Sequence, residues 1–379
     1  MKILHLLYSE QVAGAEKYLL DLLPGLKNEG IECHLICVTP AKDEHKFTRL
    51  CEELNNNGVK AVLLNGTIKN FLSIARSINK YLFDNKIKYL HAHLFKSDLL
   101  AVMVKKLFNQ KVILLSTKHG YEEKYCSNYH RYNGRIKYNL YYFISKYLLA
   151  NIDKQVAVSK AMADLYYQLK LTSERLKFIH HGINIKALPE ADDKMQYRFG
   201  DQQLIILGRI EEVKGHTYLF KALPEVMKIF PEVRLLVIGN GTQQQQLEQQ
   251  AASSGIEKNI LFMGFQQNPY PFMANSDILV SPSLYESFGL VFIEAFAMQL
   301  PVIAFDAPAA NEIIGDGQTG LLVPVYNSSQ LAEKIIFLLQ NTAERKRLAA
   351  AAFEKYLTYF NTGRMIKETA DWYRSIIAE

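Results

Sequence analysis

The chain has 379 residues, 49% of them hydrophobic and 22% charged, which is the composition of a globular protein long enough for two domains. It contains no run of 18 apolar residues, which argues against a membrane-spanning helix, and its four cysteines lack the C-x-x-C spacing of a metal or redox site. The net charge of +6 is uneven: residues 1–200 carry 30 Lys and Arg against 19 Asp and Glu (+11), and the remainder carries 14 against 19 (−5), so different partners are expected for the two halves.

The first half alternates short apolar runs with helical patterns. Strands are predicted over 3–8, 33–38, 60–65, 88–94, 112–117 and 154–159, and helices over 15–29, 70–83 and 97–108. The opening run, "ILHLLY", is expected to be a strand because it is too short for the apolar core of a secretory signal. Cys33 and Cys37 lie in the second run, where reduced, buried thiols are expected.

The same alternation begins again in the second half. Strands are predicted over 203–208, 234–239, 259–264, 277–283, 301–306 and 320–325, and helices over 214–229, 242–254, 289–298 and most of 327–379. The loop-like stretch near residue 185 contains Gly182 and Pro189 and is taken as the boundary. Strands that alternate with helices predict parallel βαβ units. The expected fold is therefore α/β, with two Rossmann-like, doubly wound domains over 1–184 and 185–361 that face an interdomain cleft, and a last helix, about 362–379, that packs back on the first domain.

Ligand-binding residues of such domains are expected in the loops at the carboxyl ends of the strands. The loop "YSEQVAGAEKYLLDLL" follows the first strand, and Gly14 stands where it enters a helix, whose N-terminal amides can seat a phosphate. An ordinary tight turn is the alternative. The G-x-G-x-x-G pattern is absent, as is a clear acidic residue for a ribose after the second strand, which counts against a nicotinamide-dependent dehydrogenase.

The segment "LGRIEEVKGHTYL" follows the first strand of the second domain. Arg209 and Lys214 stand five residues apart, with Gly208 and Gly215 on either side. Arginine offers a planar fork of donors and lysine a mobile point charge, and together they can hold a diphosphate. Ordinary surface cations are the alternative, but the flanking glycines after a strand favour a phosphate site.

The segment "LYESFGLVFIEAF" places two glutamates, Glu286 and Glu294, on either side of a glycine. On one continuous helix they would be about 12 Å apart along the axis, which fits neither of the carboxyl separations of glycosidases, about 5–5.5 Å or 6.5–9.5 Å. A helix that begins near 288–290 would instead leave Glu286 in a loop and Glu294 inside the helix. Glu294 could then accept ribose hydroxyls, and a phosphate would meet the backbone amides of Phe288, Gly289 and Leu290. Glu286 could also merely decorate the helix start.

Taken together, these motifs resemble the glycosyltransferase family 4 group, whose members are retaining enzymes with the GT-B fold. The resemblance rests on E-S-F-G-L-x-x-x-E, on "GRIEEVKG", on "EAFAMQLPVIAFDAPAANEIIGDGQTGLLV" and, in the first half, on "AGAEKYLLDLL" and "TKHG". It covers almost the whole chain and is strongest over 205–325. It implies transfer of a sugar from a nucleotide-diphosphate sugar, such as a UDP-sugar, to a glycan or lipid-linked acceptor in polysaccharide, lipopolysaccharide or capsule biosynthesis, without a metal or other cofactor.

The resemblance also implies roles for matching residues. Arg209 and Lys214 would stabilise the departing diphosphate, Glu294 would bind the ribose and Glu286 would contact hydroxyls of the donor sugar. The loop at Gly14 would close over the phosphates. Four positions depart from the family's pattern, which favours glycine there: Ala13, Gln299, Ala309 and Ala310.

Histidines of the first half complete the expected site. His119, in "TKHG", matches the family's active-site histidine near the donor sugar, and His93 is expected to be a second histidine of the cleft. His91 and His93 alternate on a predicted strand and could mimic a pair of metal ligands, but no metal is expected.

Residues 124–152 contain five Lys and Arg, eight Tyr and Phe, and no acidic residue. Three interpretations are open: an amphipathic helix packed on the sheet, docking to an anionic membrane surface or lipid-linked acceptor, and single-stranded nucleic acid, which is not expected. A cytoplasmic protein, peripheral on the inner face of the cytoplasmic membrane, is the corresponding expectation. Alternatives to a glycosyltransferase are another GT-B enzyme, such as a nucleotide-sugar 2-epimerase or a phosphorylase, and a non-catalytic sugar-nucleotide-binding protein.

Overall fold

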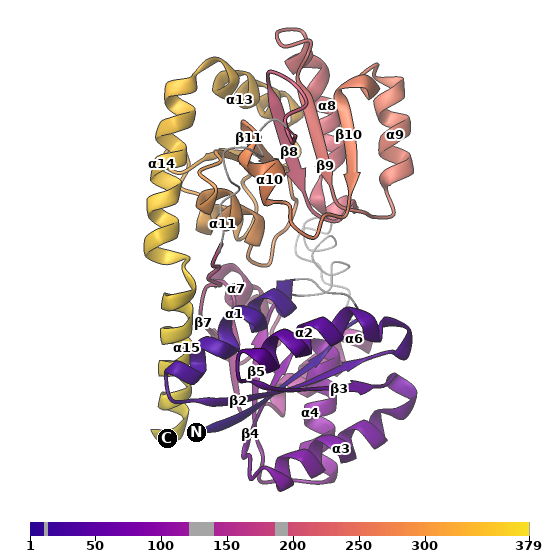
Figure 1. Cartoon of the computed structure of the whole chain (residues 1–379), viewed down its shortest axis with the longest axis vertical. Coiled ribbons are helices and arrows are strands. Elements are labelled where there is room, and N and C mark those ends of the chain that lie inside the picture. Colours follow the sequence, from indigo (N-terminus) through magenta and orange to yellow (C-terminus); the bar gives the residue numbers. More distant parts are fainter. Residues whose placement is uncertain (11–13, 121–139, 186–195, 379) are drawn as a thin grey trace. The chain divides into compact units, whose positions relative to one another are not determined.

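The computed structural model describes residues 1–10, 14–120, 140–185 and 196–378. The chain forms two compact units, Met1–Asn184 with Asn361–Glu379, and Ile185–Phe360 (Figure 1). The division at residue 185 lies where the sequence places the domain boundary. The last helix, α15 (Thr362–Ala378), belongs to the first unit, in contact with its helix α1 (Gly14–Asn28).

The first unit is built on a parallel sheet of seven strands in the order β3-β2-β1-β4-β5-β6-β7. The strands are β1 (Lys2–Tyr8), β2 (Glu32–Thr39), β3 (Lys60–Asn65), β4 (Tyr89–His93), β5 (Ile113–Lys118), β6 (Lys154–Ala157) and β7 (Lys177–Phe178). The chain winds outward from β1 to β3 and then crosses to the other side of β1 at β4. The switch point, where such sheets bind ligands, therefore lies between β1 and β4.

Helices connect these strands and cover the sheet, as Figure 1 shows. Besides α1 and α15 they are α2 (Glu44–Asn56), α3 (Phe71–Asp84), α4 (Phe95–Leu107), α6 (Leu140–Ala150) and α7 (Lys160–Gln168). Every residue of β1 after Lys2 is buried, as expected for a strand with both faces covered. One apolar cluster joins β1 to α1 and α15, with Leu19, Leu22 and Tyr373 fully buried, so burial of apolar surface holds α15 on this unit.

The second unit is built on a parallel sheet of six strands in the order β10-β9-β8-β11-β12-β13. The strands are β8 (Gln203–Leu207), β9 (Arg234–Ile238), β10 (Ile260–Gly264), β11 (Ile278–Ser281), β12 (Val302–Phe305) and β13 (Leu321–Val323). The helices are α8 (His216–Met227), α9 (Gln244–Ser253), α10 (Tyr270–Ala274), α11 (Leu290–Ala297), α12 (Ala310–Ile313), α13 (Ser328–Gln340) and α14 (Thr342–Tyr359). The switch point of this sheet lies between β8 and β11.

The prediction of two Rossmann-like α/β domains is confirmed by these two sheets. Most helix ends lie one or two residues from the prediction, and two differences have a clear structural cause. The helix expected from residue 214 begins at His216, because Gly215 takes a left-handed φ of +70° after a separate short turn, Glu212–Lys214. The helical pattern over 327–379 is three helices, because Asn341 and Phe360 leave the helical conformation.

Three of the four cysteines lie within the described residues. Cys33, Cys37 and Cys51 are buried free thiols, which confirms the expectation for the second strand. Burial raises the pKa of Cys33 to about 12, so its thiol stays protonated and packs as a small apolar side chain. Cys126 lies outside the described residues.

Candidate functional site

The loop after β8 packs tightly against the loop after β11, at the switch point of the second unit. Gly215 carries no side chain where a Cβ would lie 1.9 Å from the carbonyl oxygen of Pro282. The amide of Leu284 donates to the carbonyl of Val213 over 2.8 Å. Lys214 of "GRIEEVKG" and Glu286 of "SPSLYESFG" are 72 residues apart in the sequence. The two segments meet because β8 and β11 are neighbours in the sheet.

Lys214 and Glu286 form an ion pair in this packed region. The Lys214 Nζ lies 2.7 Å from the Glu286 Oε1, and the side chains are 19% and 9% exposed. The aliphatic stem of Lys214 lies across Gly208, where an added Cβ would be 3.5 Å from its Cδ. The sequence motifs indicated separate roles for the two residues and did not predict this pair. Each charge compensates the desolvation of the other, so neither could be removed alone without cost.

Helix α11 begins at Leu290, between the two glutamates of the E-x7-E motif. Its N-cap is Gly289, whose φ of +91° is a left-handed conformation that glycine adopts readily. The structure therefore places Glu286 in the loop and Glu294 inside the helix. The side chain of Phe288 is buried, and the centroid of its ring lies 6.1 Å from that of Phe360, so this side chain belongs to the packing of the unit.

Glu294 is 7% exposed, in a helix whose other residues from Phe292 onward are apolar. The hydroxyl of Tyr270, on α10, donates to its Oε1 over 3.3 Å. Tyr270 was missed by the sequence analysis because it lies 24 residues away and in no motif. A carboxylate at this depth needs hydrogen-bond donors, and Tyr270 supplies one of them.

Arg209 is exposed, one residue after Gly208 in the loop that follows β8. It lies at the same edge of the sheet as Lys214 because both follow β8. Glu211, between them, accepts from the backbone amide and the hydroxyl of Thr242 at 3.1 and 2.8 Å. This contact ties the β8 loop to the loop after β9, which holds the backbone under the two cations in place.

His93 and His119, the two histidines singled out from the sequence, are hydrogen-bonded in the first unit. The Nδ1 of His93, at the end of β4, lies 2.9 Å from the Nε2 of His119, directly after β5. Burial is the main cause that lowers the pKa of His119 to about 3, with Lys118 a further cause, and burial also holds the pKa of His93 well below its usual value. Both rings are therefore neutral at pH 7.

Known protein families match both halves of the chain. Residues 12–187 match the family described as "Glycosyltransferase Family 4", and residues 190–355 match "Glycosyl transferases group 1". The chain belongs to the family 4 glycosyltransferases.

Relatives of this family 4 member differ in how much of it they cover. It is 34% identical to the phosphatidyl-myo-inositol mannosyltransferase of Mycobacterium leprae over 205 residues. These residues cover 52% of this chain and 54% of that protein. The chain thus spans about half the length of that relative. Over 369 residues, 92% of this chain and 94% of the relative, it is 23% identical to the N-acetylgalactosamine-N,N'-diacetylbacillosaminyl-diphospho-undecaprenol 4-alpha-N-acetylgalactosaminyltransferase of Campylobacter jejuni.

The fold is shared with solved GT-B structures. The crystal structure of Anabaena HepE in complex with UDP and glucose matches with a TM-score of 0.81 and 21% identity, covering 99% of this chain and 100% of that one. At this identity the similarity shows that the two proteins share a fold.

Two departures from the family 4 pattern coincide with unusual backbone conformations. Gln299 and Ala309, which stand where the family favours glycine, have φ values of +52° and +68°. A side chain in such a conformation costs about 1 kcal/mol or more relative to glycine. The backbone at both positions therefore has a conformation that glycine would adopt without strain. The departures change the side chains and not the backbone conformation.

Other residues predicted for the family 4 site are described only in part. Gly14 is the first residue of α1, as the turn prediction requires, but residues 11–13, which lead into it, lie outside the described residues. The basic aromatic stretch 124–152 is described from residue 140 onward, where it forms α6.

His91 and His93, whose spacing mimics a pair of metal ligands, lie close to a third histidine, His5. Ring nitrogens of the three lie within 4.8 Å of one another. Both nitrogens of His91 are already bonded, the Nδ1 to the Tyr373 hydroxyl at 2.6 Å and the Nε2 to the Thr117 hydroxyl at 2.8 Å. A metal would have to displace these contacts and those of His93, so the residues do not fit a preformed metal site.

Proposed function

We propose that this family 4 member is a retaining glycosyltransferase, which moves a sugar from a nucleotide-diphosphate sugar to a glycan or lipid-linked acceptor in cell-surface polysaccharide synthesis. The observation that carries the proposal is the arrangement at the β8–β11 switch point. Lys214 offers a cation there, the start of α11 offers backbone amides, and Glu294 offers a buried carboxylate. These are the groups that a sugar phosphate, a second phosphate and a ribose need.

The proposed chemistry is charge stabilisation rather than attack by the protein. Breaking the sugar–phosphate bond leaves negative charge on the diphosphate, which Lys214, Arg209 and the α11 amides would stabilise. Glu286 is committed to Lys214 at 2.7 Å, so it is a poor nucleophile. We therefore propose that the acceptor hydroxyl attacks from the face that the phosphate leaves. Attack on that face gives retention, and the departing phosphate oxygen takes the hydroxyl proton, which balances the charge.

We propose a uridine nucleotide as the donor base and a lipid-linked acceptor. HepE binds UDP, and the names of the two relatives above state inositol-lipid and diphospho-undecaprenol acceptors. We also propose that no metal is needed, because the protein's own cations and amides face the site where a metal would otherwise neutralise the diphosphate.

The donor site is tested by thermal shift with UDP, GDP and ADP and their sugars, each with and without a chelator. UDP is expected to raise the melting temperature, since a ligand at 100 times its Kd stabilises by about 2.7 kcal/mol. Glu294→Gln should weaken the binding of UDP at least tenfold, which removes about 1.4 kcal/mol of the stabilisation by UDP. Glu248→Gln, on the exposed face of α9, is the matched control and should leave it unchanged. Absence of any nucleotide shift, or a shift lost in chelator, would contradict the proposal.

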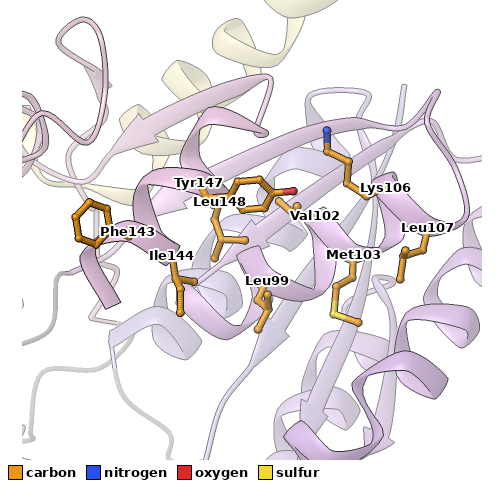
Figure 2. Close-up of a pocket in the computed structure, with 9 residues that line it drawn as sticks. All are labelled: Leu99, Val102, Met103, Lys106, Leu107, Phe143, Ile144, Tyr147 and Leu148. Carbon is orange, nitrogen blue, oxygen red and sulfur yellow. The ribbon is translucent and has the colours of Figure 1, made fainter. Parts of the chain in front are cut away.

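Membrane docking is proposed through the first unit, at an apolar groove between α4 and α6. Figure 2 shows its lining, which is apolar except for Lys106 and the Tyr147 hydroxyl. The groove holds about 400 Å³, and the side chains of Leu107, Phe143 and Tyr147 on its walls are 57–58% exposed. Tyr142 of the same helix is buried, so α6 packs some aromatics on the unit and exposes others.

Charge and apolar exposure together indicate an anionic lipid surface as the occupant. Lys106, on α4, lines the groove and is exposed, and Lys146, next to the lining residue Tyr147 on α6, is exposed as well. Exposed apolar patches of this kind mark interaction sites, and basic residues next to aromatics favour anionic headgroups. None of the described helices is long and apolar enough to cross a bilayer.

Liposome flotation tests the docking surface. With vesicles of equal parts phosphatidylcholine and phosphatidylglycerol at low salt, the wild-type protein is expected to float, and the double variant Phe143→Ser, Tyr147→Ser should stay at the bottom. Phe83→Ser is the matched control, because Phe83 is 82% exposed on α3, away from the groove. Equal flotation of the double variant, or none for the wild type, would refute this surface.

A further inference from the structure

The apolar groove between α4 and α6 is deeper than contact with a flat surface requires. Its most buried lining residues, Val102 and Leu148, are 4% and 2% exposed and form its floor, whereas the side chains of Leu107, Phe143 and Tyr147 on its walls extend into solvent (Figure 2). A bilayer surface that rests on these walls would leave the space above the floor unfilled. Atoms that line an unfilled apolar space lose packing contacts, so the groove is expected to take a separate apolar group.

The volume of the groove fits a hydrocarbon chain better than a segment of a partner protein. The groove holds about 400 Å³. A single turn of α-helix with its side chains fills roughly 400–600 Å³, given a diameter of 10–12 Å and a pitch of 5.4 Å. A protein would therefore enter with one helical turn at most, well short of the roughly 800 Å² that each partner buries in a stable interface. A flexible chain can follow the space between two helices, and the adaptable side chain of Met103 lines that space.

Polar groups at the groove indicate what the chain carries. Lys106 and Tyr147 supply the polar ends of the lining side chains, and none of the nine lining residues is acidic. In Figure 2 the Lys106 ammonium and the Tyr147 hydroxyl both lie above the side chains of Leu99 and Met103. A cation and a hydroxyl donor beside an apolar groove suit a phosphate that is attached to a hydrocarbon chain.

The position of Lys106 along α4 distinguishes this lipid from a sugar acceptor. Helix α4 begins at Phe95, two residues after the end of β4, and Lys106 lies eleven residues further on, about 16 Å along the helix axis at 1.5 Å per residue. Ligands of doubly wound sheets bind at the edge where the strands end, which is the edge at which α4 begins. A phosphate at Lys106 would lie far from that edge, so the lipid belongs to the membrane and does not carry the sugar acceptor.

We propose that the groove binds one acyl chain of a single anionic phospholipid, whose phosphate lies at Lys106. The inference rests on the membrane docking proposed above, and it replaces contact with a lipid surface in general by a site that takes one lipid molecule. When the exposed wall residues Leu107, Phe143 and Tyr147 lie in the bilayer, the groove opens into the hydrocarbon region. The chain can then enter it without crossing water.

The experiment is calorimetric titration of the full-length protein with lysophosphatidylglycerols of increasing chain length, each below its critical micelle concentration. One molecule is expected to bind per protein. Each added methylene should tighten binding about fourfold, the gain from burying one methylene, until the chain fills the groove and the affinity levels off. Lys106→Gln should weaken this binding about fivefold and leave the binding of lysophosphatidylcholine unchanged. Lys80→Gln, at an exposed lysine of α3, is the matched control and should change neither.

Ile144→Trp separates the groove from the docking surface. Ile144 lines the groove and is 36% exposed, so a larger ring can be accommodated there and would occupy the groove. This variant should bind the soluble lipids at least tenfold more weakly. It should still float with anionic vesicles, because the exposed wall residues and Lys106 remain. Ile68→Trp, at a site that is 62% exposed in the short turn before α3, is the matched control and should behave as the wild type in both assays.

The proposal is overturned if the wild-type protein binds these lipids only above their critical micelle concentration, if its affinity rises with chain length without levelling off, or if Ile144→Trp binds as tightly as the wild type. Tighter binding of farnesyl phosphate than of a lysophosphatidylglycerol with a chain of similar length would also overturn it, and would assign the groove to a lipid-linked acceptor. Flotation without binding of the soluble lipids would refute the single-lipid site and leave the docking surface standing. Binding of the soluble lipids without flotation would support the site and count against the docking surface alone.

Discussion

Lys214→Ala is expected to slow sugar transfer by about 10²–10³-fold, the loss seen when one preorganised group is removed from a developing charge. The Nζ of Lys214 is held 2.7 Å from Glu286 and its stem lies across Gly208, so the cation is positioned before the donor arrives. Single-turnover rates with saturating donor measure the effect. Lys228→Ala is the control: Lys228 pairs with Glu225 at the same 2.7 Å, but both are exposed, so activity and stability should change little.

Lys214→Ala also leaves the partly buried carboxylate of Glu286 without its partner, which is expected to lower the free energy of unfolding by about 2 kcal/mol. The double variant Lys214→Met, Glu286→Gln separates the two effects. It removes both charges, so urea unfolding should show most of the stability restored. Transfer should stay low because the cation is still missing. Recovery of transfer in the double variant would mean that Lys214 acts through folding alone.

Gly215→Ala is expected to destabilise the second unit by more than 3 kcal/mol. Its φ of +70° already disfavours a side chain, and the new Cβ would lie 1.9 Å from the carbonyl oxygen of Pro282, which is backbone and cannot rotate away. The loop after β8 would have to separate from the loop after β11, and Lys214 would move with it. Donor turnover should therefore fall together with the unfolding midpoint.

Gly255→Ala is the matched control for that effect. Gly255 has nearly the same φ, +68°, in the same unit, but a Cβ there would meet no atom within 4 Å. Backbone strain alone should then cost about 1 kcal/mol. Urea unfolding of the two variants measures the difference. Equal losses would show that the contact between the two loops is not what holds the site together.

The positions of the motifs in loops and at helix starts could be predicted from the sequence, because they depend on the burial pattern and backbone freedom of nearby residues. Alternating apolar runs and helical patterns indicate buried parallel strands with crossover helices, and each sheet has this order. Gly289, before an apolar run, indicated that a helix begins between Glu286 and Glu294, and α11 begins at Leu290. Left-handed Gly215 delays the start of the helix predicted from residue 214 to His216, a turn detail that periodicity does not report.

The contacts within the site depend on strand order, which periodicity does not carry. Lys214 and Glu286 pair because β8 and β11 are neighbours, although β9 and β10 lie between them in the sequence. His5 joins His93 for the same reason, since β1 and β4 are neighbours across the other switch point. The sequence by itself determined which residues end each strand and enter each helix, because those are matters of local burial and backbone freedom. Only the tertiary structure decided which of them meet, because a sheet's strand order is chosen by packing of the whole unit.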